Sequence, residues 1–152
     1  MKLKGKTALI TGGGSGLGFA FAKRLAQDGA NIVIADIRGA SDAAKILQES
    51  DFKAVGVALD VSQEESVIAA VDVVNSSYGG VDILVNNAAL FSTLVNKPFD
   101  EIDSAEWMKV MTVNTLGPFL CAKHFSPHMK QKKWGRIINV ASTSALKGVA
   151  NM

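Results

Sequence analysis

The sequence predicts an α/β fold: a doubly wound parallel sheet with helices on both faces. Apolar runs of strand length recur along the chain, and they are continuous rather than alternating, which is typical of strands buried on both faces. Segments with apolar residues at helical spacing lie between them, and this alternation favours parallel strands joined by right-handed crossovers. We expect the strands at Thr7–Thr11, Asn31–Ala35, Lys53–Leu59, Val81–Val85 and Arg136–Val140.

Apolar residues at helical spacing indicate helices between the strands. The stripes are Phe21, Leu25 and Ala26 in the first, Val67, Val71 and Val74 in the second, and Trp107, Met111 and Asn114 in a third. Residues 62–65, Ser-Gln-Glu-Glu, precede the second stripe and fit a capping box. The third stripe predicts a long helix that starts near Asp103.

Composition bounds the class of protein. A chain of 152 residues is one domain, 1–152, by the length prior, and 48% hydrophobic with 20% charged residues is ordinary for a globular protein. A net charge of +2 without a dense basic block predicts neither a nucleic-acid nor an anionic-membrane partner. Cys121 is the only cysteine, which excludes an intramolecular disulfide and a thiolate metal cluster. The N-terminus is basic and then apolar, but its apolar run is only Ala8–Ile10, so we expect a strand, no signal peptide and a cytoplasmic protein.

A glycine-rich loop follows the first predicted strand and opens the first helix. It reads T-G-x-x-x-G-x-G, and its residues are Thr11, Gly12, Gly14, Ser15, Gly16, Leu17 and Gly18. Glycines permit a tight turn and a close approach of the backbone to a pyrophosphate, while the helix N-terminus offers free N–H groups. A flexible glycine turn is the alternative, but the strand before it and the helix after it favour a dinucleotide site.

Asp36 closes the second predicted strand, and we assign it and its neighbour Ile37 to the cofactor site. A carboxylate there accepts hydrogen bonds from both ribose hydroxyls of NAD and repels a 2′-phosphate. Arg38 would soften that repulsion, although we interpret it as a solvated loop charge. The glycine loop holds no Lys or Arg, so the sequence predicts NAD rather than NADP.

Five ordered motifs resemble the N-terminal part of the short-chain dehydrogenase/reductase family. They are the glycine loop, Asp60-Val61, Asn86-Asn87-Ala88-Ala89 (N-N-A-G in the family), Asn114 and Ser142. The resemblance implies a Rossmann-type fold that lacks its last strands and helices in this chain. It also implies that Asp60 and Val61 contact the adenine and that Asn87, Ala88 and Ala89 line the cofactor site. Ala89 replaces the family glycine and adds a Cβ without removing a donor or acceptor.

The resemblance also implies two catalytic residues. Ser142 would hydrogen-bond the substrate carbonyl oxygen and stabilise its developing negative charge. Asn114 would hold a water through its main-chain carbonyl, because Pro118, four residues on, has no N–H to donate to it. A structural hydrogen bond of a buried amide is the alternative role for Asn114. The family's tyrosine acid/base follows the serine by roughly a dozen residues, beyond Met152, and its lysine follows the tyrosine.

Two classes of function remain open. The first is an NAD-dependent oxidoreductase, represented here by a fragment, that interconverts an alcohol and a carbonyl compound, either a ketone or an aldehyde-level substrate, by hydride transfer and forms a homo-oligomer. The second is a non-catalytic dinucleotide-binding or interaction module that ends at Met152. The identity of the small-molecule substrate cannot be read. His124 and His128 lie four residues apart, but Pro127 intervenes and no third ligand is near, so we expect no metal site.

Overall fold

The computed structural model describes residues 1–147 and contains one parallel sheet in the order β3-β2-β1-β4-β5. The strands are β1 (Thr7–Thr11), β2 (Asn31–Asp36), β3 (Ala54–Ala58), β4 (Ile83–Asn86) and β5 (Arg136–Asn139). Each strand begins and ends within one residue of its predicted bounds, except that β4 begins two residues later than predicted. The strand order reverses between β1 and β4, and the loops after these two strands therefore flank the topological switch point of the sheet.

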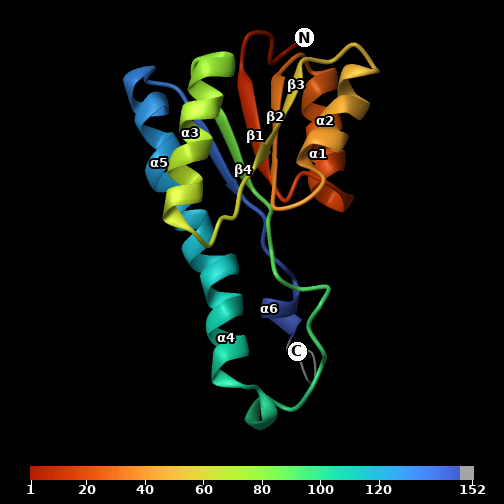
Figure 1. The fold of residues 1–152 in the computed structure, drawn as a ribbon, viewed down its shortest axis with the longest axis vertical. Helices are drawn as coiled ribbons and strands as arrows, with labels where there is room; N and C mark the ends of the chain where they lie inside the picture. The colour runs from red at the N-terminus through yellow and green to blue at the C-terminus, as the bar shows by residue number, and fades with distance from the viewer. Residues whose placement is uncertain (148–152) are drawn as a thin grey trace.

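Helices cover both faces of the sheet, as the sequence predicts. In Figure 1, α1 (Gly16–Gln27) and α2 (Ala40–Gln48) lie on one side, and α3 (Glu64–Tyr78) and α5 (Gly117–Gln131) lie on the other. Leu9 of β1 belongs to the buried cluster under α3 and α5, whereas its neighbour Ile10 belongs to the cluster under α1 and α2. Successive side chains of a strand point to opposite faces, and this is why the apolar runs are continuous.

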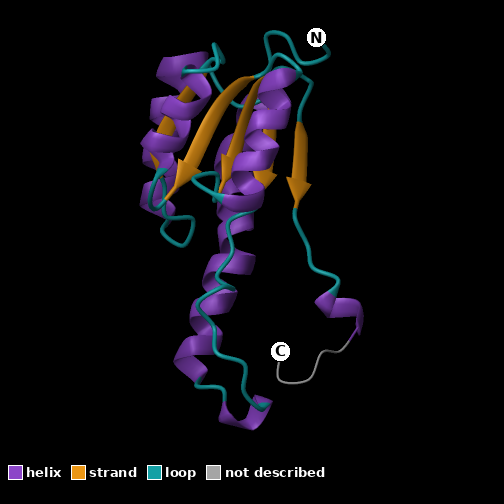
Figure 2. Ribbon diagram, turned by 90° about the vertical axis from the view of Figure 1, so that its right-hand side faces the viewer, coloured by secondary structure: helices purple, strands orange, loops and turns teal. Residues whose placement is uncertain are grey.

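The third predicted helix is longer and less regular than a single α-helix. It comprises α4 (Ser104–Met111), a π-helical turn at Thr112–Leu116 and then α5. The Asp103 carboxylate caps it by accepting a hydrogen bond of 2.6 Å from the Ala105 N–H. Figure 2 shows α4 extending well beyond the edge of the sheet. A short 3₁₀ turn (Phe99–Glu101) precedes it, and α6 (Ser144–Lys147) follows β5.

Two predictions about these elements are wrong in detail. The capping box does not form, because α3 starts at Glu64 after Gln63 and the Ser62 hydroxyl bonds to Asp60 instead. In α1 the fully buried side chains are Ala22 and Ala26, while Phe21 and Leu25 are only partly covered. Alanines there let the helix lie close to the sheet, and the larger apolar side chains cover its flanks.

Strand β5 departs from the predicted burial on both faces. All four of its residues are exposed, and so is Val140 after it. The strand lies at the edge of the sheet beside β4, so its other side has no neighbouring strand among residues 1–147. Its composition is that of a buried strand, whereas its surroundings in this chain are those of an edge.

The buried thiol of Cys121 gives a first testable prediction. Its side chain is fully enclosed in the cluster under α3 and α5, and burial raises its pKa to about 12. We expect no reaction of the folded protein with a disulfide reagent at pH 8, since the thiolate is the reactive form. Unfolding in denaturant should release one reactive thiol per chain. Reaction of the folded protein at the rate of the unfolded one would contradict this packing.

Candidate functional site

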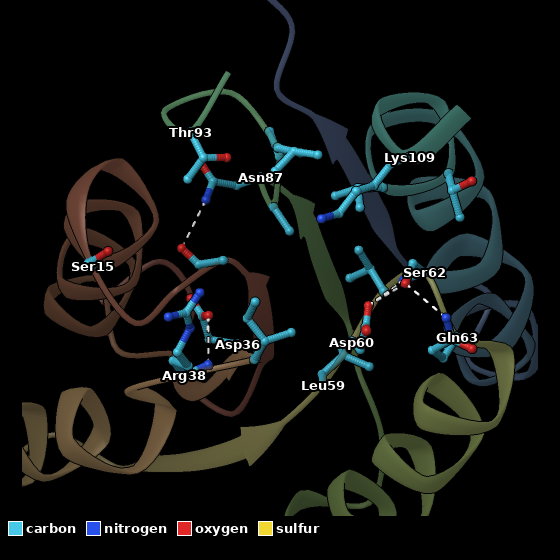
Figure 3. A pocket seen from close by; sticks show the side chains of 18 residues that line it. Ser15, Asp36, Arg38, Leu59, Asp60, Ser62, Gln63, Asn87, Thr93 and Lys109 are labelled. Atoms are coloured by element: carbon cyan, nitrogen blue, oxygen red, sulfur yellow. Dashed lines mark hydrogen bonds between the residues drawn. The ribbon is translucent and has the colours of Figure 1, made fainter. Parts of the chain in front are cut away.

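A cavity of about 860 Å³ opens beyond the carboxyl ends of the strands (Figure 3). Nine of its lining residues were predicted for cofactor binding from the sequence: Gly12, Ser15, Asp36, Ile37, Asp60, Val61, Asn87, Ala88 and Ala89. They come from loops after four different strands, which the sheet order brings to one place. The structure therefore joins segments that are up to about half the chain apart in sequence.

Thr11 and Asn87 fasten the two central loops of this cavity to each other. The Thr11 hydroxyl oxygen accepts hydrogen bonds of 3.0 Å from the N–H groups of both Asn87 and Ala88. In return, the Asn87 amide donates to the carbonyl oxygens of Thr11 and Gly12, at 3.0 and 3.1 Å. Thr11 itself is buried and does not line the cavity, so it supports the cavity loops from the interior of the protein.

Close contacts leave no room for a side chain at two glycines of the loop, and a positive φ favours glycine at a third. A Cβ on Gly18 would lie 2.1 Å from the Gly12 carbonyl oxygen and 2.6 Å from the Asn87 amide nitrogen. A Cβ on Gly14 would lie 2.6 Å from the Arg38 carbonyl oxygen. Gly16 has open space around it, but its φ of +54° favours glycine. Leu17 is largely exposed and, like these three glycines, does not line the cavity.

The Asp36 carboxylate is held in place by main-chain donors. One oxygen accepts a hydrogen bond of 2.9 Å from the Gly14 N–H, and the other accepts one of 3.1 Å from the Arg38 N–H. Figure 3 shows the Asp36 and Arg38 side chains side by side at one end of the cavity. The acidic group thus joins the glycine loop to the end of β2. Ile37 lines the same end and is mostly exposed.

Asp60 lies farther along the cavity, after β3. One of its carboxylate oxygens accepts hydrogen bonds from the Ser62 N–H at 2.9 Å and from the Ser62 hydroxyl at 2.6 Å. The second carboxylate oxygen accepts no hydrogen bond from residues 1–147. The Asp60 carboxylate can therefore stabilise the turn at Ser62 with one oxygen and accept a hydrogen bond from a ligand with the other.

Asn114 is exposed and sits in the π-helical turn, which corrects the expectation of a buried amide. Its side chain forms a two-way clamp on Leu90: its oxygen accepts from the Leu90 N–H at 2.7 Å, and its nitrogen donates to the Leu90 carbonyl at 3.2 Å. The ladder here is not α-helical, since the Gly117 N–H reaches the Thr112 carbonyl five residues back. Pro118 has no N–H for the carbonyl of Asn114 at α-helical spacing.

Ser142 follows β5 on the loop to α6 and is exposed. Its hydroxyl donates to the Ser144 hydroxyl at 3.1 Å and accepts from the Ser144 N–H at 3.2 Å. It does not line the cavity in residues 1–147. The rest of the loop expected to form the active site, residues 148–152, lies outside the described part of the chain.

Comparison with known proteins decides the family. The chain matches the short chain dehydrogenase family over residues 6–152. It belongs to that family. It is 38% identical over 147 residues to cis-4-hydroxycyclohexanecarboxylate dehydrogenase of Sinomonas cyclohexanicum, covering 96% of this chain and 58% of that protein. It is 40% identical over 147 residues to D-beta-hydroxybutyrate dehydrogenase of Cupriavidus necator, covering 95% of this chain and 55% of that protein.

Solved structures of short-chain dehydrogenases have the same fold. NAD⁺-bound xylitol dehydrogenase superposes with a TM-score of 0.93 at 35% identity, covering 100% of this chain and 58% of that one. A metagenomic short-chain oxidoreductase in complex with NADP superposes with a TM-score of 0.89 at 30% identity, covering 99% and 68%. The Rossmann-type fold expected from the sequence is confirmed. The chain spans somewhat more than half the length of the curated relatives described above.

Several residues that line the cavity of this family member were not predicted from the sequence. They are Leu59, Ser62, Gln63, Leu90, Thr93, Lys109, Thr112 and Val113, together with Arg38, which we had interpreted as a solvated charge. Lys109, Thr112 and Val113 lie on the long helix at the spacing i, i+3 and i+4, which places them on one face. At about 100° per residue, this face lies opposite the apolar stripe of Trp107, Met111 and Asn114 that predicts the helix.

The two histidines of α5 do not converge. His124 lies 2.6 Å from the Glu64 carboxylate, whereas the His128 ring lies against Gly80. Hydrogen bonds from Lys123 and then His124 hold the pKa of the Glu64 carboxyl below its usual value. No cluster of three metal-binding side chains occurs in residues 1–147. In the same range, no helix has the length and apolar composition needed to cross a membrane.

Proposed function

We propose that this chain is the cofactor-binding part of an NAD-dependent oxidoreductase that interconverts an alcohol and a carbonyl compound by hydride transfer. The observation that carries the choice of NAD is the Asp36 carboxylate, which is fixed at the cavity by two main-chain N–H groups. Both oxygens keep lone pairs for ribose hydroxyls, and their charge repels a 2′-phosphate. NAD, when bound, supplies the hydride acceptor.

The remaining roles follow the residues in place. The N–H groups at the start of α1, around Ser15 and Gly16, would face the pyrophosphate. Asp60 and Val61 would hold the adenine, and the loop at 87–89 would support the second ribose. Ser142 would polarise the substrate carbonyl, and the Asn114 carbonyl would hold a water for proton relay. The Leu90 clamp gives Asn114 a second role, since it fixes the loop that follows Ala89.

The preference for NAD is tested by titrating NAD and NADP against the intact enzyme, meaning the product of the whole reading frame to which this chain belongs. We expect NAD to bind at least about tenfold more tightly, equivalent to about 1.4 kcal/mol. Asp36→Ser should reduce that ratio by weakening NAD and relieving the repulsion of NADP. Arg38→Ala serves as the matched variant and should leave NAD affinity nearly unchanged. Equal or tighter NADP binding by the unaltered enzyme would contradict the proposal and assign Arg38 to the phosphate.

The catalytic class is tested separately, with a panel of secondary alcohols as substrates. Small hydroxy acids and polyols head the panel, because the named relatives act on compounds of these kinds. We propose that the intact enzyme is a cytoplasmic homo-oligomer. Cofactor binding without turnover of any alcohol, in a frame that stops at codon 152, would favour a non-catalytic dinucleotide-binding module instead.

A further inference from the structure

The ends of β4 and β5 are joined by a pair of amides that the proposed reaction does not use. Asn86 and Asn139 are register partners in adjacent parallel strands, and the Asn86 amide nitrogen donates to the Asn139 side-chain oxygen at 2.8 Å. The Asn86 carbonyl also accepts from the Val140 N–H at 3.0 Å. A weaker contact of 3.5 Å joins the Asn86 amide to the Pro118 carbonyl at the start of α5.

The side-chain oxygen of Asn86 is buried without a hydrogen-bond partner in residues 1–147. Asn86 is only 5% exposed, and none of the described residues donates a hydrogen bond to this oxygen. A buried acceptor without a partner destabilises the fold, and an apolar side chain of similar size would avoid that cost. Stability alone therefore does not explain an asparagine here, whereas a positional role does.

The sequence on either side of the pair indicates what is positioned. Asn87 and Ala88, directly after Asn86, are pinned by the Thr11 hydroxyl and line the cavity. Ser142 lies three residues after Asn139 on the neighbouring strand. The pair therefore lies between the cofactor loop and the proposed polarising serine: Asn86 is joined directly to the loop, and Asn139 is three residues before Ser142.

We propose that Asn86 and Asn139 are positioning residues that fix the Ser142 strand end relative to the cofactor loop at 87–89. The coupling of the two strand ends stands on the observed hydrogen bonds. Its consequence for Ser142 rests on the proposed function. Without the side-chain pair, the end of β5 is held to β4 within residues 1–147 only by the main-chain hydrogen bond from the Val140 N–H to the Asn86 carbonyl, and both loops fluctuate more.

Hydrogen exchange of the intact enzyme without cofactor tests the coupling. In Asn139→Ala, which alters an exposed residue, we expect the amides of Asn87, Ala88 and Val140 to exchange about tenfold faster or more. Amides in the middle of β1 and β2 should keep their rates. Asn139→Asp retains the acceptor oxygen for the Asn86 amide and should restore protection. Asn86→Leu should loosen the same amides without lowering the melting temperature, and Asn75→Ala, on the exposed face of α3, is the control.

A uniform increase across β1 and β2 with a lower melting temperature would overturn the proposal, because it would show a purely structural pair. Unchanged exchange at Asn87 and Ala88 would overturn it as well. These measurements need no cofactor, so they stand whether or not NAD binds. If turnover is found, Asn139→Ala should lower kcat by about tenfold while the KM for NAD stays within about twofold. An unchanged kcat would remove the link to Ser142 and leave NAD binding unaffected.

Discussion

The 152-residue chain by itself is expected to oxidise no alcohol at a measurable rate with NAD. Its sole tyrosine, Tyr78, lies at the end of α3 and packs, partly buried, against the cluster between the sheet and α3 and α5, and this burial raises the pKa of its hydroxyl. A general acid/base needs a pKa near the working pH, so this shift is in the wrong direction. Loss of a general acid/base removes about 10²–10⁴ in rate, and the lysine that accompanies it in the family pattern would be lost too.

Poor solubility should accompany the inactivity. Strand β5 presents Ile137 and Ile138 on opposite faces of the sheet, and α4 and α5 present Trp107, Met108 and Phe119, all more than 40% exposed. Contiguous apolar surface and an uncovered strand edge promote association. Supplying a C-terminal half in trans, taken from the reading frame past codon 152, should restore cofactor-dependent activity. A soluble, monodisperse 152-residue species that turns over an alcohol unaided would show that the proton donor lies elsewhere.

Replacing Gly18 with alanine is expected to abolish tight cofactor binding. The added Cβ would lie 2.1 Å from the Gly12 carbonyl oxygen, a backbone atom that cannot rotate away, and 2.6 Å from the Asn87 amide nitrogen. The start of α1 must then move away from the loop, and both Asn87 hydrogen bonds to the loop are strained. Overpacking of this kind costs about 1–3 kcal/mol, which we expect as a loss of about ten- to a hundredfold in NADH affinity of the intact enzyme.

Gly16→Ala is the matched variant for that experiment. Its Cβ meets no protein atom within 4 Å, so within the protein the change adds only the strain of a φ of +54°, about 1–2 kcal/mol. Titration of NADH fluorescence, with thermal melting in parallel, separates a loss of affinity from a loss of folded protein. An affinity for Gly18→Ala equal to that of Gly16→Ala would mean that the loop relaxes freely around the new methyl group.

The sequence predicted the fold largely because continuous apolar runs and a glycine loop are local signals. The strands, the order reversal between β1 and β4, and the gathering of Asp36, Asp60 and Asn87 at one edge follow from those signals and from topology. The predictions that failed concern features that depend on residues nearby in space, such as the hydrogen-bond partner of a side chain. The Ser62 hydroxyl had two possible partners, and the nearer Asp60 carboxylate replaced the capping box. Helix α2 went unpredicted although the sequence carries a signal for it, since its buried residues Ala40, Ala43, Ala44 and Leu47 recur at helical spacing.

The site was predicted less completely than the fold. Residues on loops after the strands were found because topology alone places them. Residues on the long helix were missed because they lie on the face opposite the apolar stripe that predicted the helix. The exposure of Asn114 was also missed, since α4 extends beyond the sheet and none of its residues is buried, so the apolar stripe there does not face a core.

The π-helical turn at Thr112–Leu116 holds one residue more than an α-helical turn would. Each residue advances an α-helix by about 100°, so conversion of this segment to α-helical geometry at constant length would rotate α4 by about that angle relative to α5. Lys109 would then leave the cavity wall, and Asn114 would lose its alignment with Leu90. Deletion of one residue in the turn would instead remove the extra residue and leave α4 close to its present orientation, so the direction in which Lys109 points depends on the turn type and the length of the segment together.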